Sequence, residues 1–197
     1  KMKSREGTVV DADTLIKKMR EDSRLIIKNS NKLDDSSDEE INLLSKKIGD
    51  AALKYFILKI DANKNMMFNP SESIDFNGNT GPFIQYSYAR IKSILRRKKD
   101  FKPIFHLEKK SSLEEKGLLK FILDYPMVII ESGNAKNPSF LANYIYQLAK
   151  LYNKFYQKII ILDGSKDENY RLAISKKVAD IIKEGMSILG IDVPEKM

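Results

Sequence analysis

The stretch Phe76-Asn-Gly-Asn-Thr-Gly-Pro-Phe-Ile-Gln-Tyr-Ser-Tyr-Ala-Arg-Ile-Lys-Ser-Ile-Leu-Arg96 passes from a turn into a helix. Its glycines and asparagines tolerate positive φ, and Pro82 suits a first helical turn, where its missing N–H costs nothing. At helical spacing, one stripe is apolar: Ile84, Tyr88, Ile91 and Leu95. A neighbouring stripe is aromatic and cationic: Tyr86, Arg90, Ser93 and Arg97. The pattern predicts a helix with one face for a core and one for an anion, although an ordinary solvated basic side fits the periodicity as well.

The rest of the chain also reads as helix. The capping boxes Ser37-x-x-Glu40 and Ser112-x-x-Glu115 each open an apolar-periodic segment, and Ser139 is the expected cap of a later one. Pro126 is expected to end or kink the helix that contains it, with residues 128–130 continuing as helix or as a short strand, of which we favour helix. The sequence predicts a mostly α protein, with a helical bundle from about residue 81 onward and a smaller helical segment before it.

Composition restricts the function further. There are 35 Lys and Arg residues against 27 Asp and Glu residues, which gives a formal net charge of +8 and favours a polyanionic partner. Cysteine is absent and His106 is the only histidine, so no metal site or Ser-His-Asp triad is expected. No apolar run is long enough to span a bilayer, and we expect a cytoplasmic protein with no membrane contact.

Several motifs occur in the order found in one enzyme family. They are Lys1–Val10, Ala52–Leu58, the stretch 67–96, Leu141–Tyr146 and Ile188–Met197. Together they resemble the arginyl-tRNA synthetases, which are class I enzymes, from the signature loop to the C-terminus. The resemblance implies two parts: residues 1–80, with the loop and a stem-contact segment, and residues 81–197, a helical anticodon-binding domain of the DALR type. It also implies tRNA(Arg) as the partner and a monomer, and it suggests that the sequence is the C-terminal part of a longer enzyme.

The resemblance assigns catalytic chemistry to the first residues. Lys1 and Met2 match the Lys-Met-Ser-Lys-Ser loop of class I enzymes, whereas Lys3, Ser4 and Arg5 depart from it. The implied catalytic residues are Lys1, Lys3 and Arg5, and the implied ATP contacts are Lys1, Met2, Lys3 and Ser4. Which cation reaches the pyrophosphate stays open. The sequence contains no His-x-Gly-His segment and no βαβ alternation, so arginine and ATP with Mg²⁺ are expected only in the full-length enzyme, and this chain alone is expected to be inactive.

RNA binding is the function expected of the chain itself. Bases can stack on exposed aromatic rings and phosphates can pair with cations, and the candidates are Tyr86, Arg90, Arg97, Tyr146 and Tyr156. The resemblance adds Met186, Lys196 and Met197. Arg90 has an internal alternative, which is an ion pair with Asp75 or another carboxylate. Two other functions stay open, a free-standing RNA-binding module without ligase activity and a helical protein-interaction domain.

Overall fold

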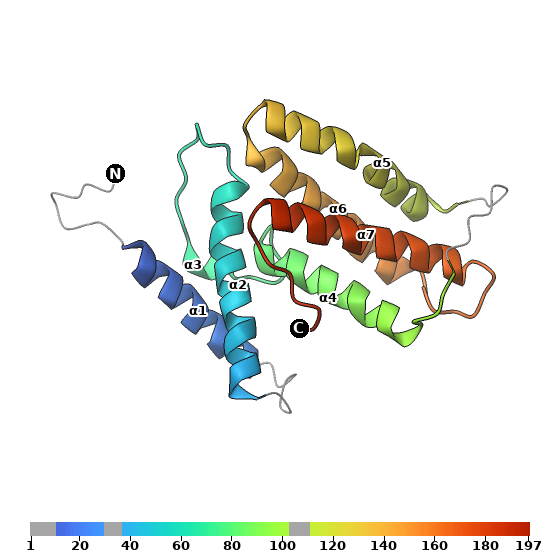
Figure 1. The fold of residues 1–197 in the computed structure, drawn as a ribbon, viewed down its shortest axis with the longest axis horizontal. Helices are drawn as coiled ribbons and strands as arrows, with labels where there is room; N and C mark the ends of the chain where they lie inside the picture. The colour runs from blue at the N-terminus through green and yellow to red at the C-terminus, as the bar shows by residue number, and fades with distance from the viewer. Residues whose placement is uncertain (1–10, 30–36, 103–110) are drawn as a thin grey trace.

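The computed structural model describes residues 11–29, 37–102 and 111–197, and within these ranges it contains helices and no strand. The helices are α1 (Ala12–Asn29), α2 (Asp38–Leu58), α3 (Pro70–Ser73), α4 (Gly81–Arg97), α5 (Leu113–Asn134), α6 (Pro138–Lys158) and α7 (Glu168–Ile188). In Figure 1, α4 to α7 form a bundle, and α1 and α2 lie beside it at one end. The predicted mostly α fold is therefore confirmed.

The helix starts follow local side-chain chemistry. Both predicted capping boxes are present, at Ser37 with Glu40 and at Ser112 with Glu115. Thr80 caps α4, where its hydroxyl accepts a hydrogen bond from the Phe83 backbone N–H at 3.2 Å. The predicted cap of α6 was wrong. Asn137 lies at that position, because its side-chain oxygen accepts from the Ser139 N–H at 3.0 Å, and Pro138 begins the helix.

Helix α5 runs continuously through Pro126, so residues 128–130 are helical, as favoured from the sequence. Proline lacks the N–H of a helical hydrogen bond, and such a position is retained only where packing holds the helix on both sides. Here Leu118 and Tyr125, before the proline, are buried in the core shared with α6, and Val128 and Ile129, after it, pack against the same core. Tertiary burial therefore overrides the local cost of the proline.

The larger hydrophobic core lies among α4, α5, α6 and α7 and includes Ala51 and Tyr55 from α2. Tyr55 is fully buried, and its hydroxyl donates to the side-chain oxygen of Asn79 at 2.7 Å and to the Ala142 carbonyl at 3.1 Å. Burial raises the pKa of the Tyr55 hydroxyl well above its ordinary value, so it stays a protonated donor. These bonds fix α2 against the turn before α4 and against α6.

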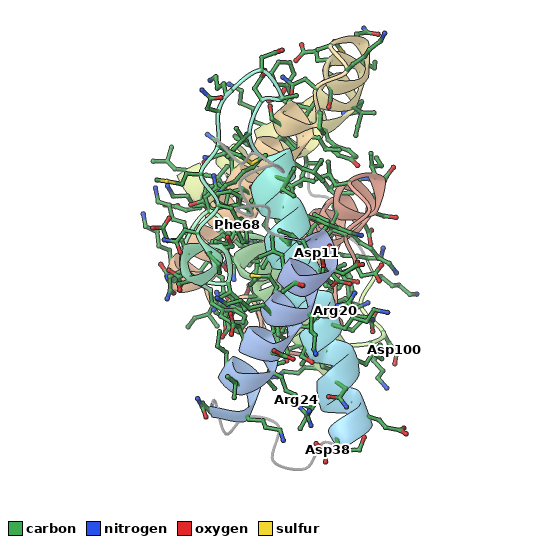
Figure 2. All side chains as sticks on the ribbon, turned by 90° about the vertical axis from the view of Figure 1, so that its left-hand side faces the viewer. Asp11, Arg20, Arg24, Asp38, Phe68 and Asp100 are labelled. Carbon is green, nitrogen blue, oxygen red and sulfur yellow. The ribbon has the colours of Figure 1, made fainter. Side chains whose placement is uncertain are left out.

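A second, smaller cluster joins α1 and α2 and contains the buried residues Met19, Ile27, Ile48, Ala52 and Ile74. An Arg20–Asp50 pair closes its edge through two hydrogen bonds of 2.7 and 2.9 Å. Figure 2 shows α1 lying across α2, with Arg20 and Arg24 on it and Asp38 at the start of α2. Helix α2 contributes to both clusters. The domain boundary predicted between residues 80 and 81 stays a prediction.

Gly81 has a different role from the one expected of it. The positive-φ glycines in the described residues are Gly164 and Gly190, and Gly81 is not among them. Gly81 is the first residue of α4 and lies against the backbone of α2, where an added Cβ would be 2.5 Å from the Ala51 carbonyl oxygen. The glycine is therefore needed for the close crossing of two helices.

After α7 the chain turns at Gly190, which has a φ of 69° and follows the helix end. The segment 190–197 then lies along α2 and α4, which is visible in Figure 1. Lys54 donates to the Gly190 carbonyl at 2.5 Å, Gln85 to the Asp192 carbonyl at 2.7 Å, and Arg96 to the Glu195 carbonyl at 2.9 Å. Side chains of two helices thus hold the C-terminal segment in place.

Candidate nucleic-acid interface

Arg90 lies at the centre of the aromatic and cationic stripe of α4. Its guanidinium carbon is 4.8 Å from the centre of the Tyr86 ring and 5.0 Å from the centre of the Tyr156 ring. The guanidinium also donates to the side-chain oxygen of Asn153 at 2.7 Å. Tyr156 and Asn153 belong to α6, so this single side chain joins α4 to α6. We call Tyr86, Arg90, Asn153 and Tyr156 the Arg90 cluster.

The internal alternative for Arg90 was correct in part. The side chain is an internal bridge, but its partners are an amide and two rings, and the expected ion pair with Asp75 or another carboxylate is absent among the described residues. Asn153 is itself oriented, because its amide donates to the Ser87 hydroxyl at 2.8 Å. With no carboxylate beside it, Arg90 keeps a positive charge that attracts an anion.

The two tyrosines of the cluster differ in exposure. The Tyr156 ring is 41% exposed, whereas Tyr86 is half-buried and meets Phe76 edge to face at 6.4 Å between ring centres. Base stacking needs an accessible ring face. Tyr156 is therefore the better placed of the two for a base, and Tyr86 mainly supports the guanidinium.

A groove lies beside the Arg90 cluster, between the C-terminal ends of α4 and α6. It has a volume of about 460 Å³ and is lined by Ile94, Arg97, Tyr156 and the segment 157–162. We call it the Arg97 groove. Arg97 is exposed at its edge, and isoleucine side chains from 159, 160 and 161 supply apolar surface. An aromatic ring, apolar walls and a cation in one hollow suit an unstacked base with its phosphate.

Residues of α7 hold one wall of the Arg97 groove in position. The Arg171 guanidinium donates to the Ile160 carbonyl at 2.9 Å and to the Asp163 carboxylate. Hydrogen bonds from Ser165, and then the bond and charge of Arg171, hold the pKa of Asp163 well below its usual range. The carboxylate therefore remains charged at neutral pH, and the wall is fixed by a permanent ion pair.

Glu168 joins this wall to the end of α4. Its carboxylate accepts from the Lys98 ammonium and from the Gly164 backbone N–H, the latter at 2.6 Å. Lys98 directly follows Arg97, so the pair sets the separation of the two sides of the groove. The Lys98 hydrogen bond, followed by that of Gly164, lowers the pKa of Glu168 from its ordinary value of 4.5.

We expect Glu168→Gln to lower the melting temperature at neutral pH and to lose this effect in acid. A carboxylate whose pKa is lower when folded stabilises the fold above its unfolded pKa, and that contribution disappears as pH falls through the folded pKa. The measurement is the melting temperature of both proteins from pH 7 to pH 3. The two curves should converge below about pH 4.5, the ordinary value. A difference that persists unchanged to pH 3 would contradict the role assigned to this ionised side chain.

The other predicted RNA contacts lie in different surroundings. Tyr146 is half-buried, with its ring 5.4 Å from that of Phe83, and it belongs to the edge of the main core. Lys196 is exposed near the end of the chain, and Met197 is half-buried against the cluster of α1 and α2. The prediction for Met186 was wrong, because its side chain is 0% exposed and offers no surface for RNA. Its helical spacing from Val178 and Ile182 was the available signal for a core position.

The signature-loop residues Lys1, Met2, Lys3, Ser4 and Arg5 lie outside the described residues, as does His106. Nothing in the described ranges gathers three or more His, Cys, Asp or Glu side chains in a way that would hold a metal ion. Within the same ranges, no helix is both long and apolar enough to cross a membrane.

The fold and this face define the class of the protein, which is a helical domain of the anticodon-binding type. The model of the DALR anticodon binding domain matches residues 84–197, and the chain belongs to that family. The chain is similar to the arginine–tRNA ligases of Flavobacterium psychrophilum, at 52% identity over 200 residues, and Parabacteroides distasonis, at 49% over 203 residues. Each alignment covers 100% of this chain but only 33% and 34% of the relative, so the chain spans about one third of their length.

Solved structures agree with these relatives. The arginyl-tRNA synthetase of Thermus thermophilus matches with a TM-score of 0.86 and 25% identity, over 96% of this chain and 32% of that one. The enzyme from Plasmodium falciparum matches with a TM-score of 0.78 and 27% identity, over 96% and 34%. The family predicted from the sequence is therefore confirmed, and the matched region is the C-terminal part of these enzymes.

Proposed function

We propose that the chain is the tRNA-binding C-terminal part of an arginine–tRNA ligase and that the Arg90 cluster and the Arg97 groove contact the anticodon loop of tRNA(Arg). The observation that carries the proposal is the placing of Arg97 and the exposed Tyr156 ring in one groove. A base can stack on Tyr156 while Arg97 neutralises the neighbouring phosphate. The family match supports an anticodon-binding role for the same helices.

The full-length enzyme would join arginine to tRNA(Arg) with ATP and Mg²⁺, first as an adenylate and then on the terminal ribose. Lys1, Lys3 and Arg5 are the proposed catalytic cations, with Lys1, Met2, Lys3 and Ser4 at the nucleotide. These residues lie outside the described ranges. Tyr146, Lys196 and Met197 remain proposed tRNA contacts. A cytoplasmic, monomeric enzyme is part of the same proposal.

The test of this proposal is Arg97→Ala in a titration of tRNA(Arg) binding at several salt concentrations. Each lost phosphate contact removes roughly one unit from the slope of log K against log salt, so we expect a slope lower by about one. Arg97 is exposed, and its loss should change the free energy of unfolding by less than about 0.5 kcal/mol. The matched control is Lys116→Ala, which removes an exposed cation from α5 and should leave the slope unchanged.

Three other results would contradict parts of this proposal. An equal slope for the Arg97 and Lys116 variants would remove Arg97 from the RNA contact. If the unsubstituted chain shows no salt-dependent binding to RNA at all, the proposal fails and a helical protein-interaction domain becomes the better account. Binding to tRNA(Arg) and to unrelated RNA with equal affinity would favour the free-standing RNA-binding module.

A further inference from the structure

A second groove lies between α4 and α7, and it is more strongly cationic than the Arg97 groove. It has a volume of about 360 Å³, and its charged lining consists of Lys92, Arg96, Lys99, Lys176, Lys183, Asp180 and Glu195. Five cations therefore face two carboxylates, an excess of three positive charges. We call this hollow the basic groove. None of its cations was singled out from the sequence, because they come from helices about 80 residues apart.

The two carboxylates are already paired. Lys92 contacts Glu195 at 3.0 Å, and Lys176 contacts Asp180 at 2.7 Å. Arg96 donates to the backbone carbonyl of Glu195, which leaves its charge uncompensated. Lys99 and Lys183 form no ion pair or side-chain hydrogen bond within the described residues, so the basic groove holds three cations that no carboxylate neutralises.

Two further features fit a nucleic acid. The lining includes the half-buried side chains of Phe101 and Leu95, so apolar surface lies among the cations. The pKa of Glu195 is lowered, first by the Lys92 hydrogen bond and then by the charges of Lys92, Lys183 and Arg96. Three cations of the basic groove thus create a positive potential at the Glu195 carboxylate. Cations spread along a hollow with aromatic surface are typical of contacts to a phosphate backbone.

The basic groove and the Arg97 groove lie on different sides of α4. At 3.6 residues per turn, Lys92 and Arg96 are rotated from Arg90 by about 200° and 240°, while Arg97 is rotated by only about 20° in the other direction. One short RNA loop on the Arg97 groove therefore does not reach the basic groove directly. A partner for the basic groove must be another segment of a large anion.

We propose that the basic groove binds the sugar–phosphate backbone of the tRNA at a segment separate from the one on the Arg97 groove, with Lys99, Lys183 and Arg96 as the phosphate-binding cations. This inference rests on the proposed function, because it assumes that RNA is the partner. It adds a second contact surface that supplies affinity without reading bases, since phosphate contacts carry no sequence information. The two surfaces contribute independently, because they share no side chain.

The experiment compares Lys99→Ala/Lys183→Ala with Lys116→Ala/Lys120→Ala, which removes two exposed lysines from α5. Binding of a tRNA(Arg) transcript to the full chain is measured across a salt series. The groove variant should lower the log–log slope by about two, and the α5 variant should leave it unchanged. Melting temperatures of both variants should match the unsubstituted protein, because neither groove lysine has a side-chain partner to lose.

The outcomes separate this inference from the proposed function. Suppose that Arg97→Ala lowers the slope but the groove variant has the same slope as the α5 control. The RNA-binding role of the basic groove is then overturned, and the proposed function stays in place. A lower slope for the groove variant with no change for Arg97→Ala supports the basic groove and overturns the Arg97 contact. Equal losses in both lysine pairs would show non-specific attraction to net charge and would overturn the inference.

Discussion

Gly81→Ala is expected to destabilise the fold by about 3 kcal/mol, at the upper end of overpacking effects. An alanine Cβ would lie 2.5 Å from the carbonyl oxygen and 2.8 Å from the carbonyl carbon of Ala51. Both atoms are helix backbone in α2, which cannot rotate away as a side chain can, so α4 and α2 would have to separate. In a chain of this size, that loss corresponds to roughly 6–12 °C in melting temperature.

The matched control is Gly117→Ala, in the second turn of α5. A Cβ at Gly117 meets nothing within 4 Å, so the same substitution there should stabilise the helix by about 0.5–1 kcal/mol. The sign of the effect therefore depends on the neighbour and not on the residue type. A Gly81→Ala protein that melts within 1 °C or so of the unsubstituted protein would contradict the close crossing of α2 and α4.

Arg90→Ala is expected to cost about 2 kcal/mol of stability and also to weaken tRNA binding. The substitution removes a charge-assisted hydrogen bond to Asn153, worth about 1.5–3 kcal/mol, and two ring contacts, worth about 0.5–1 kcal/mol each. The cost of removing the arginine side chain from water offsets part of this sum. The melting temperature should fall by roughly 4–8 °C. The effect on binding arises mainly from the altered position of Tyr156, which loses the side chain that its ring contacts.

A double-mutant cycle with Asn153→Ala tests the bridge directly. Arg90 and Asn153 are in contact, so their two losses should be less than additive by at least about 0.5 kcal/mol. Arg90→Ala combined with Lys116→Ala is the control, and those losses should add. If Arg90→Ala lowers the slope of log K against log salt by a full unit and leaves the melting temperature unchanged, the Arg90 side chain contacts a phosphate. Its role as a bridge between α4 and α6 is then contradicted.

Gly81 and Arg90 both stabilise the position of α4, which carries part of the proposed tRNA-binding surface. Gly81 sets the approach of α4 to α2, and Arg90 sets its approach to α6. Of the two exposed groups of the proposed interface, Arg97 lies outside these contacts, whereas Tyr156 also contacts Arg90. Substitutions of Gly81 and Arg90 should therefore change melting and binding together, whereas substitution of Arg97 should change binding alone.

The sequence by itself determined the helices and their buried stripes. Capping boxes, the turn before Gly81 and 3.6-residue periodicity are local properties, because each depends on side chains within a few positions of one another. Ile84, Tyr88 and Ile91 are buried as their spacing predicts. The family resemblance likewise depended on ordered motifs that can be recognised without any contact between them.

Only the tertiary structure decided which exposed residues share a surface. Arg90 contacts Asn153 and Tyr156, and Lys99 and Lys183 line the same groove, across separations of about 60 to 85 residues that no local period encodes. The same helix phase that predicts a stripe does not say which neighbouring helix covers it. Met186 was assigned to the RNA surface by the resemblance, although its helical spacing from Val178 and Ile182 indicated the core. Pairing between helices depends on the packing of side chains from both partners and on the loops that join them, and these form only when the whole core closes.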